Sequence, residues 1–391
     1  MNIFIRNFFL IPINTFTIKA ELQKEFLYSL KKANSDIERS YNQYKCQKFI
    51  NKKRTFLFYN IVSFLLICPI IIIYIFRPKS KRRCEINCNA VFANSQRKIL
   101  PSCLKDEYNI IQTVDFNQKA NLELKDLRFI FEIIIKKPFS FYFLAKNIIK
   151  IAIYRSIIQQ YRPYSFLVTS EYSFTSSILT SFCERNNVEH INIMHGEKLF
   201  FIRDSFFRFT RCYVFDKHYI TLFQKLRANN NNFIVTQPPS LKINIFKYKK
   251  ERQVYDFTYY LAAYNENQII DIINILKALV SINYKVKIRP HPRYSDLSLL
   301  NKYIDSIELE DTKTISIEES LASTKNAIGL YTTVLYQAFL NNINIVFDDI
   351  VFKEEFKTLW SLDYILISKR YILLSEIIEF ESYKNKKVDK K

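Results

Sequence analysis

Apolar and polar residues alternate in two regular patterns from about residue 85 onward. Short runs rich in β-branched and aromatic residues predict strands, and most are followed by segments in which apolar residues have helical spacing. The predicted strands span residues 89–95, 108–114, 165–171, 190–196 and 212–216 in the first half, and 257–264, 284–289, 305–310, 326–331 and 343–349 in the second. Strands alternating with helices indicate an α/β protein with parallel sheets, because a parallel crossover needs a dozen or more residues.

The helical segments also divide the chain. In the second half they are predicted at 266–282, 294–304, 316–323 and 332–342, whereas a long helix at 122–161 in the first half is broken near Pro138. Residues 237–250 contain Pro-Pro and then many lysines, and they are the best linker candidate. We therefore predict two Rossmann-like domains, 85–250 and 251–391, facing a cleft in which ligands bind beyond the carboxyl ends of the strands.

Residues 1–84 have a different character. The stretch 56–76 holds 21 residues without a charge, which is long enough to cross a bilayer. Basic residues flank it on both sides, so the positive-inside rule assigns no orientation, and Pro69 would kink a spanning helix. We predict a membrane-associated segment, peripheral or single-pass, and the alternatives are a helix buried against protein or one lying in the interface. Residues 1–16 lack the features of a signal peptide and are a candidate second membrane contact.

The net charge of +21 raises the question of nucleic-acid binding. Residues 1–83 hold 16 Lys and Arg against 4 Asp and Glu, a net +12, and residues 384–391 hold 5 against 1, a net +4. The two ends therefore carry 16 of the 21 charges, and no helix-turn-helix, RNA-recognition or zinc-finger pattern occurs between them. Basic ends beside an apolar segment fit an anionic membrane surface. We expect the cytoplasmic face of the inner membrane as a partner, and no nucleic acid.

Residue counts exclude several kinds of site. Gly196 and Gly329 are the only glycines, which excludes a Walker P-loop, a dinucleotide fingerprint and a nucleophile elbow, since each needs closely spaced glycines. Seven cysteines without a C-x-x-C pair predict free thiols in a reducing compartment. Four histidines without a metal-binding motif predict no transition-metal site, and we expect no cofactor. Asp348 and Asp349 are candidates for magnesium, and their structural alternative is a loop or a helix cap.

Polar residues with catalytic or binding potential follow the predicted strands one after another. They are Glu171, His195 and Glu197 in the first half, and His291, Thr332, Thr333, Asp348 and Asp349 in the second. Because the carboxyl ends of parallel strands lie at one edge of a sheet, each of these can face the cleft. Thr332 and Thr333 open a predicted helix, where hydroxyls beside unpaired N–H groups make an anion site. Plain N-capping is the alternative for them.

The stretch 287–293 reads KIRPHPR and ends a predicted strand. Arg289, His291 and Arg293 alternate, so an extended segment would direct all three side chains to the same side. Pro290 and Pro292 fix φ, which would hold the imidazole in place before a ligand arrives. The alternative for His291 is a solvent-facing loop histidine.

The motif RPHPR at 289–293, followed by the hydroxyl pair in GLYTTVLYQAFLNNINIVFDD at 329–349, resembles bacterial GT-B glycosyltransferases that use CMP-activated sugars. These are the sialyltransferases, polysialyltransferases and capsule Kdo transferases. The same set is similar to the teichoic-acid glycerophosphotransferases, which use CDP-glycerol. The resemblance covers roughly residues 85–385 and implies a GT-B fold. It further implies that His291, Pro292, Thr332 and Thr333 hold the nucleotide phosphate, with Arg289 and Arg293 nearby, and that Glu318 or Glu319 holds the ribose.

One place departs from the sialyltransferase pattern. Those families carry two acidic residues before a glycine in the N-terminal domain, where this chain reads Met194-His195-Gly196-Glu197. A His-Gly pair is closer to the glycerophosphotransferases. An acceptor hydroxyl must lose its proton as it attacks, and a histidine has the reference pKa nearest neutrality, so His195 is the expected base. Glu197 and Glu171 are the reserves, and a core histidine beside a simple glycine turn is the structural alternative.

The function expected from these features is inverting, metal-independent transfer of a sugar from a nucleotide-sugar donor. The donor would be CMP-activated, such as sialic acid or Kdo, and the acceptor a surface glycan, free or lipid-linked, of the O-antigen, lipooligosaccharide or capsule. Two alternatives stay open: a CDP-polyol phosphotransferase of the teichoic-acid type, and a catalytically inactive membrane-bound scaffold.

Overall fold

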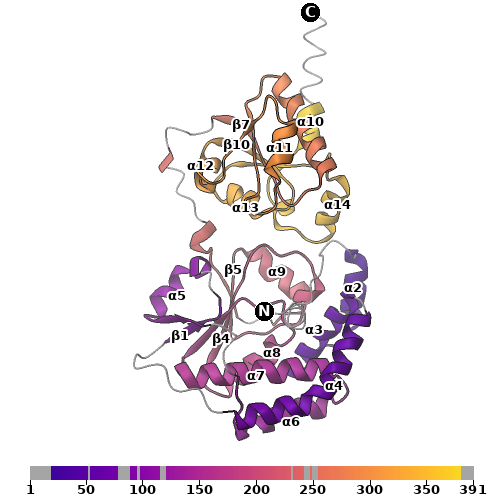
Figure 1. Cartoon of the computed structure of the whole chain (residues 1–391), viewed down its shortest axis with the longest axis vertical. Coiled ribbons are helices and arrows are strands. Elements are labelled where there is room, and N and C mark those ends of the chain that lie inside the picture. The colour runs from indigo at the N-terminus through magenta and orange to yellow at the C-terminus, as the bar shows by residue number, and fades with distance from the viewer. Residues whose placement is uncertain are drawn as a thin grey trace, which may run out of the picture. The chain divides into compact units, whose positions relative to one another are not determined.

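The computed structural model describes residues 19–51, 53–77, 89–94, 97–114, 120–229, 232–241, 247–248 and 254–379. By their internal contacts the residues form two compact units, Met1–Pro239 and Ser240–Lys391. Each unit contains a parallel six-stranded sheet with helices (Figure 1), so the predicted α/β class with two Rossmann-like units is confirmed. The five cysteines that the structure describes are free thiols, as predicted. The apolar stretch 1–16, the lysines at 384–391 and much of the linker at 237–250 lie outside the described residues.

The first unit has the strand order β2-β1-β3-β4-β5-β6, and all neighbouring strands are parallel. All five strands predicted for this half are present, and β6 is an addition that is too short to show a pattern. The strands are β1 (Ala90–Phe92), β2 (Ile111–Thr113), β3 (Ser165–Val168), β4 (Glu189–Ile193), β5 (Arg211–Val214) and β6 (Phe233–Val235).

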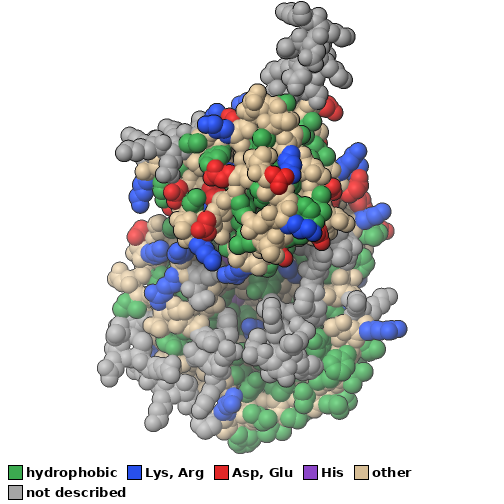
Figure 2. Space-filling view, turned by 45° about the horizontal axis from the view of Figure 1, so that its top comes forward, with side chains coloured by type: hydrophobic (Ala, Val, Ile, Leu, Met, Phe, Trp, Pro, Cys, Tyr) green, Lys and Arg blue, Asp and Glu red, His purple; other side chains and the backbone are tan. Residues whose placement is uncertain are grey.

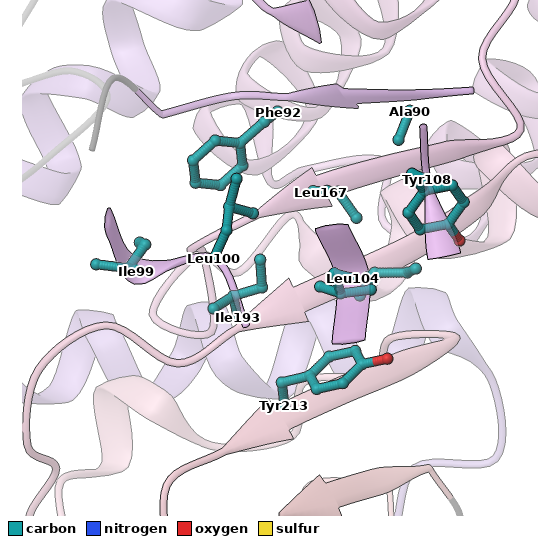
Figure 3. Close-up of a cluster of buried hydrophobic side chains, with 10 residues drawn as sticks. Ala90, Phe92, Ile99, Leu100, Leu104, Tyr108, Leu167, Ile193 and Tyr213 are labelled. Carbon is teal, nitrogen blue, oxygen red and sulfur yellow. The ribbon is translucent and has the colours of Figure 1, made fainter. Parts of the chain in front are cut away.

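Helices cover both faces of this sheet. They are η2 (Arg97–Ile99), α5 (Ser102–Glu107), α6 (Leu124–Lys136), α7 (Phe141–Tyr161), α8 (Ser176–Glu184), η3 (Ile202–Asp204) and α9 (Lys217–Lys225). On one face Leu167 of β3 belongs to a buried cluster with Phe92 and with Leu104 of α5 (Figure 3). On the other, the Phe166 ring stacks on Tyr154 of α7 with 4.2 Å between ring centroids. Successive residues of a strand point to opposite faces, so this sheet is buried on both sides.

The second unit has the strand order β12-β11-β10-β7-β8-β9, again with parallel neighbours. Counted from the start of the unit this is 6-5-4-1-2-3, the order of the dinucleotide-binding Rossmann fold. The strands are β7 (Tyr255–Tyr260), β8 (Val286–Arg289), β9 (Glu308–Leu309), β10 (Thr324–Gly329), β11 (Asn344–Phe347) and β12 (Ile372–Leu373). The direction of winding reverses between β7 and β10, and open α/β sheets bind ligands at such a switch point.

The helices of the second unit follow the predicted order. They are η4 (Pro239–Leu241), α10 (Glu266–Ser281), α11 (Leu297–Tyr303), α12 (Ile317–Ala322), α13 (Thr333–Leu340), α14 (Lys353–Ser361) and η6 (Ile365–Ser368). The first four α-helices of this set were predicted, and α14 was not. Each of the four begins after a strand, so its N-terminus lies at the carboxyl edge of the sheet.

Three N-terminal helices belong to the first unit: α2 (Ala20–Ser29), α3 (Asp36–Ile50) and α4 (Lys53–Phe76). From α3, Gln43 Nε2 donates to the backbone oxygens of Glu171 at 2.8 Å and Arg203 at 2.9 Å. Within α4, Arg54–Phe76 is long and apolar enough to cross a membrane by length and composition alone. The predicted membrane association is compatible with this helix, and the cellular location stays a prediction.

Candidate functional site

The carboxyl edge of the second sheet gathers the residues predicted to bind the donor. Arg289 of β8 is paired with Tyr260 of β7, and Gly329 of β10 with Phe347 of β11, so the ends of these four strands form one row. His291 lies two residues after the end of β8. Thr332 lies three residues after the end of β10. Since β8 and β10 are separated by one strand, the ends of the strands that carry the two residues are roughly 10 Å apart across the sheet.

His291 has a defined tautomer at this edge. Its Nδ1 accepts a hydrogen bond from the backbone N–H of Arg293 at 3.1 Å, and its ring stacks on Tyr294 with 4.5 Å between centroids. Desolvation, together with the charge of Arg293, lowers the pKa of His291. A neutral ring whose Nδ1 accepts a hydrogen bond carries its proton on Nε2. The partly exposed side chain therefore presents an Nε2–H donor, which can bind a phosphate oxygen.

The prediction that KIRPHPR is extended throughout is wrong, because strand β8 ends at Arg289. The backbone turns at 292–294, where the N–H groups of Tyr294 and Ser295 both donate to the carbonyl of His291. Arg293 lies exposed in this turn. The alternation of Arg289, His291 and Arg293 therefore does not place three side chains on one side of a strand. The sequence Pro-x-x-Ser permits the turn, because the Ser295 hydroxyl accepts the N–H of His291 at 2.8 Å.

Arg289 is engaged inside the second unit. Its guanidinium bonds to Glu310 Oε2 at 2.5 Å and to the carbonyl of Ile315 at 3.0 Å, and the residue is 9% exposed. Lys287, two residues earlier, contacts the other oxygen of Glu310. Glu310 could not be identified from the sequence, because a single carboxylate at the end of a short strand has no distinguishing pattern. The role of Arg289 is thus to neutralise a buried carboxylate under the strand end that carries His291.

Thr332 and Thr333 occupy the predicted place at the start of a helix. Thr332 is the N-cap of α13, and its hydroxyl accepts the N–H of Val334 at 3.4 Å. Thr333 is the first residue of the helix and is exposed. The α13 N-terminus lies at the switch point between β7 and β10, so its free N–H groups and partial positive charge face the place where Rossmann sheets bind anions. Capping and anion binding can coexist here, because the cap uses only one N–H group.

Glu318 and Glu319 lie in the first turn of α12, which follows β9 at the same edge. Glu319 forms a capping box with Ser316, in which each side chain accepts the other residue's backbone N–H. Glu318 is exposed. Of the two predicted ribose ligands, Glu318 therefore has the side chain that is not already part of the helix cap.

Asp348 and Asp349 have structural partners. Asp348 is fully buried and accepts hydrogen bonds from Tyr259 Oη at 2.6 Å and from the backbone N–H groups of Ile350 and Val351. Burial raises the pKa of this carboxyl. Asp349 accepts the N–H and the hydroxyl of Ser375. Within the part of the chain that the structure describes, no three His, Cys, Asp or Glu side chains are grouped as a metal site would need.

In the first unit His195 follows β4 at the carboxyl edge of its sheet. The side chain is exposed and has no hydrogen-bond partner among the described residues, so it is not a core histidine. His190, by contrast, is fully buried, contacts Tyr154 and Thr180, and has a pKa lowered by desolvation to about 3. Gly196 has φ +69°, a conformation that glycine adopts without strain, and it turns the chain directly after His195.

Glu171 and Glu197 differ in their surroundings. Glu171 follows β3, the neighbour of β4, and is fully buried in an ion pair with Lys198. Desolvation lowers the pKa of Lys198, but the charges of Glu171 and Asp204 raise it further, so the net shift is upward. The second oxygen of Glu171, Oε2, has no hydrogen-bond partner within the described residues. Glu197 is partly buried. Lys198 was missed, because a lysine after His-Gly-Glu has no diagnostic spacing.

Comparisons with known proteins add little to these observations. No family model and no curated protein matches the chain. Among solved structures, the wall teichoic acid polymerase TagF is 11% identical over 89% of this chain and 92% of its own, with a TM-score of 0.40. MnaA of S. aureus bound to UDP is 13% identical over 66% and 78%, with 0.41. The UDP-GlcNAc 2-epimerase from Methanocaldococcus jannaschii is 10% identical over 67% and 83%, with 0.42.

Proposed function

We propose that the chain is a transferase that moves a group from a cytidine-nucleotide donor to an acceptor hydroxyl. The single observation that carries this proposal is the switch point of the second sheet. There the Nε2–H of His291 and the N-terminus of α13, with Thr332 and Thr333, lie at one edge of a Rossmann-ordered sheet. Both features donate hydrogen bonds to anions, and neither needs a glycine-rich loop.

The first form of the reaction is inverting sugar transfer from a CMP-activated sugar, such as sialic acid or Kdo, to a surface glycan. The acceptor oxygen forms a bond to the anomeric carbon as the bond from that carbon to the phosphate oxygen breaks, and CMP leaves. His195 takes the proton of the acceptor hydroxyl. His291 and the α13 N-terminus stabilise the negative charge that develops on the departing phosphate.

The second form is transfer of a polyol phosphate from a CDP-polyol, and the exposed His195 before Gly196 favours it. In this reaction the acceptor oxygen bonds to the β-phosphorus, the phosphoanhydride bond breaks, and CMP leaves again. The same proton acceptor and the same phosphate ligands serve both forms. An exposed histidine in place of the acidic pair of sialyltransferases is therefore the feature of this chain that points toward phosphoryl transfer.

Donor assays separate the two forms. The full chain would be incubated with an acceptor glycan and either radiolabelled CMP-sugars or radiolabelled CDP-polyols, and label in the product measured. We expect His195→Ala to lower transfer at least a hundredfold with the competent donor, the usual contribution of a general base. His218→Ala, which changes a partly exposed histidine after β5, is the matched control and should keep activity. An inactive protein that also fails to bind CMP and CDP would instead be a scaffold.

We further propose that the protein works at the cytoplasmic face of the inner membrane, where lipid-linked glycan acceptors lie. The apolar helix α4 and the basic N-terminal region support this location. Fractionation of cells that express the tagged chain tests it, and recovery of the protein in the soluble fraction alone would contradict it.

A further inference from the structure

The residues that flank α6 lie against α4 near both of its ends. At one end Leu57 of α4 and Phe139, which follows α6, line the same pocket. At the other, the backbone N–H of Leu122, just before α6, donates to the carbonyl of Tyr74 in α4 at 2.9 Å. The two helices therefore run antiparallel at the lower end of Figure 1, and both ends of α4 are attached to the first unit.

One side of α4 is packed along its length against that unit. Tyr59, Ser63 and Ile67 are buried at helical spacing, and the Tyr59 ring lies 5.3 Å from that of Tyr142 in α7. A helix crossing a bilayer would have to leave α7 or draw it into the membrane. The latter would carry buried Arg155 into lipid with its ion-pair partner on α6. The contacts of α4 thus favour a helix that lies flat.

The other side of α4 forms an apolar face. Its exposed residues are Leu57, Phe58, Ile61, Phe64, Leu65, Leu66, Ile72, Ile73 and Phe76, each at least 46% exposed, and α6 and its following turn add Leu124, Phe131, Ile135 and Phe139. Figure 2 shows hydrophobic side chains gathered at this end of the molecule. A contiguous face of this extent marks a surface that contacts another apolar phase.

A basic pocket of about 630 Å³ opens at the edge of the apolar face. Lys45 and Lys48 of α3 and Arg54 of α4 supply its charges, and Tyr41, Phe56 and Leu57 are among its walls. Residues 41, 45 and 48 share one face of α3, because they are spaced by four and three.

Among the residues that the structure describes, no carboxylate lines this pocket. The cations Lys45, Lys48 and Arg54 have no ion-pair partner among the described residues, and the nearest acids of α3 are used elsewhere. Asp36 pairs with Arg208, and Glu38 accepts the N–H of Asn34. A fourth cation, Lys137, lies 4.4 Å from the centroid of the Tyr41 ring. Several cations held together without a counter-ion form a site for an anion with more than one acceptor oxygen.

We propose that this pocket binds the phosphate of an anionic phospholipid headgroup, while α4 lies in the plane of the bilayer interface with its apolar face among the acyl chains. Pocket and face adjoin at Leu57 and Phe139, so a lipid can place its headgroup in one and its tails along the other. The inference concerns membrane docking and is independent of the donor chemistry.

Charge decides between a bilayer and a second copy of the chain as the occupant. Lys48, Arg54 and Arg77 lie at the ends of the apolar face, and Lys136 and Arg128 lie exposed on α6. A symmetric dimer through this face would bring two basic rims together, whereas an anionic bilayer presents the opposite charge.

Vesicle sedimentation tests the pocket. Full-length protein is titrated with phosphatidylglycerol/phosphatidylcholine vesicles, and compared with the triple variant Lys45→Gln, Lys48→Gln, Arg54→Gln. We expect the affinity of the triple variant for these vesicles to be lower on the order of 100-fold. Each basic residue near the membrane surface contributes roughly a factor of ten or less, and three are removed. The control variant Lys313→Gln, Lys353→Gln, Arg370→Gln makes the same charge change at exposed positions of the second unit and should bind as the wild type does.

Other outcomes overturn the proposal. Equal losses in both triple variants would mean attraction by net charge without a pocket. If 10 mM inorganic phosphate or glycerol phosphate released the protein from the vesicles, the pocket would be a site for soluble phosphate. A concentration-dependent dimer that Leu65→Asn dissociates, without vesicle binding, would mean a second copy on the apolar face. Circular dichroism of each variant establishes that it folds.

Depth measurement tests the orientation of α4. The single tryptophan, Trp360, is replaced by phenylalanine, and Phe64→Trp places a probe in the middle of the apolar face. A flat helix predicts strongest quenching by lipids labelled near the headgroup. Strongest quenching by lipids labelled near the end of the acyl chain, together with resistance to carbonate extraction, would mean that α4 spans the bilayer.

Discussion

Glu310 provides the sharpest test of how the second unit holds its strand end. Its side chain is 1% exposed and contacts Lys287 and Arg289, whose side chains are also almost completely buried. Glu310→Gln keeps the shape and removes the charge, so two buried cations lose their counter-ion. Breaking a buried ion pair in this way costs about 3–5 kcal/mol. Lys287 keeps its bond to Ser323 Oγ at 2.8 Å and its position 4.5 Å from the centroid of the Tyr255 ring, but neither partner carries a negative charge.

Urea denaturation followed by tryptophan fluorescence measures this loss in the correct unit, because Trp360 lies in α14 of the second unit. With an m-value of about 2 kcal/mol per M, the midpoint should fall by roughly 1.5–2.5 M. Glu318→Gln removes an exposed carboxylate and should change stability by no more than about 0.5 kcal/mol. A loss below about 1 kcal/mol for Glu310→Gln would refute the buried cluster as described.

Three further predictions concern the first unit. Desolvation, together with neighbouring Lys150, lowers the pKa of buried Lys146 from 10.5 to about 7. Between pH 7 and pH 10.5 the unfolded chain therefore binds more protons than the folded chain. The free energy of unfolding then rises with pH by up to about 1.4 kcal/mol per pH unit. Lys146→Met should stabilise at pH 7 and flatten this slope in urea titrations; an unchanged slope would contradict the buried position. Asp126→Asn breaks the buried ion pair with Arg155 and should lower the free energy of unfolding by about 3–5 kcal/mol. Chemical denaturation followed by circular dichroism measures this loss, and a loss under about 1 kcal/mol would argue against the ion pair. Gly196→Ala places a side chain at φ +69° without a clash and should lower the free energy of unfolding by about 1–2 kcal/mol. Gly196→Asn should lower it less, because asparagine tolerates this conformation better. Equal stabilities of the wild type and the two variants would contradict the left-handed turn.

Much of the fold was predictable because parallel strands have strong local patterns. Each of the ten predicted strands is present, including β4, whose run of apolar residues ends at His195. The break near Pro138 correctly separated α6 from α7. The short strands β6 and β12 were missed, since two or three residues show no period and depend on a neighbouring strand for their pairing. Helix α3 was missed because its buried face is polar, with Gln43 and Gln47 bonded to loop carbonyls.

The candidate site was predictable in position and less so in detail. Topology alone carries His291 and Thr332 to one edge, because residues after parallel strands meet there. The orientation of Arg289 depended on Glu310, a residue that is distant in sequence and becomes a partner only when β9 pairs with β8. The turn at 292–294 depends on the hydrogen bond from the His291 N–H to Ser295 Oγ. The alternating positions of Arg289, His291 and Arg293 gave no indication of this bond. Pairings between distant residues are therefore the part of the site that sequence patterns do not specify.

Calorimetric titration with CMP and CDP tests the central claim, which is that the switch point of the second sheet holds a nucleotide phosphate. We predict that the full chain binds at least one of the two, and that His291→Ala weakens binding at least tenfold by removing a hydrogen bond to a charged group. Thr333→Pro keeps the helix but removes one of the free N–H groups at the α13 N-terminus, so it should weaken binding as well. His218→Ala should bind as the wild type does. Unchanged affinity in His291→Ala would contradict the assignment of this edge as the phosphate site.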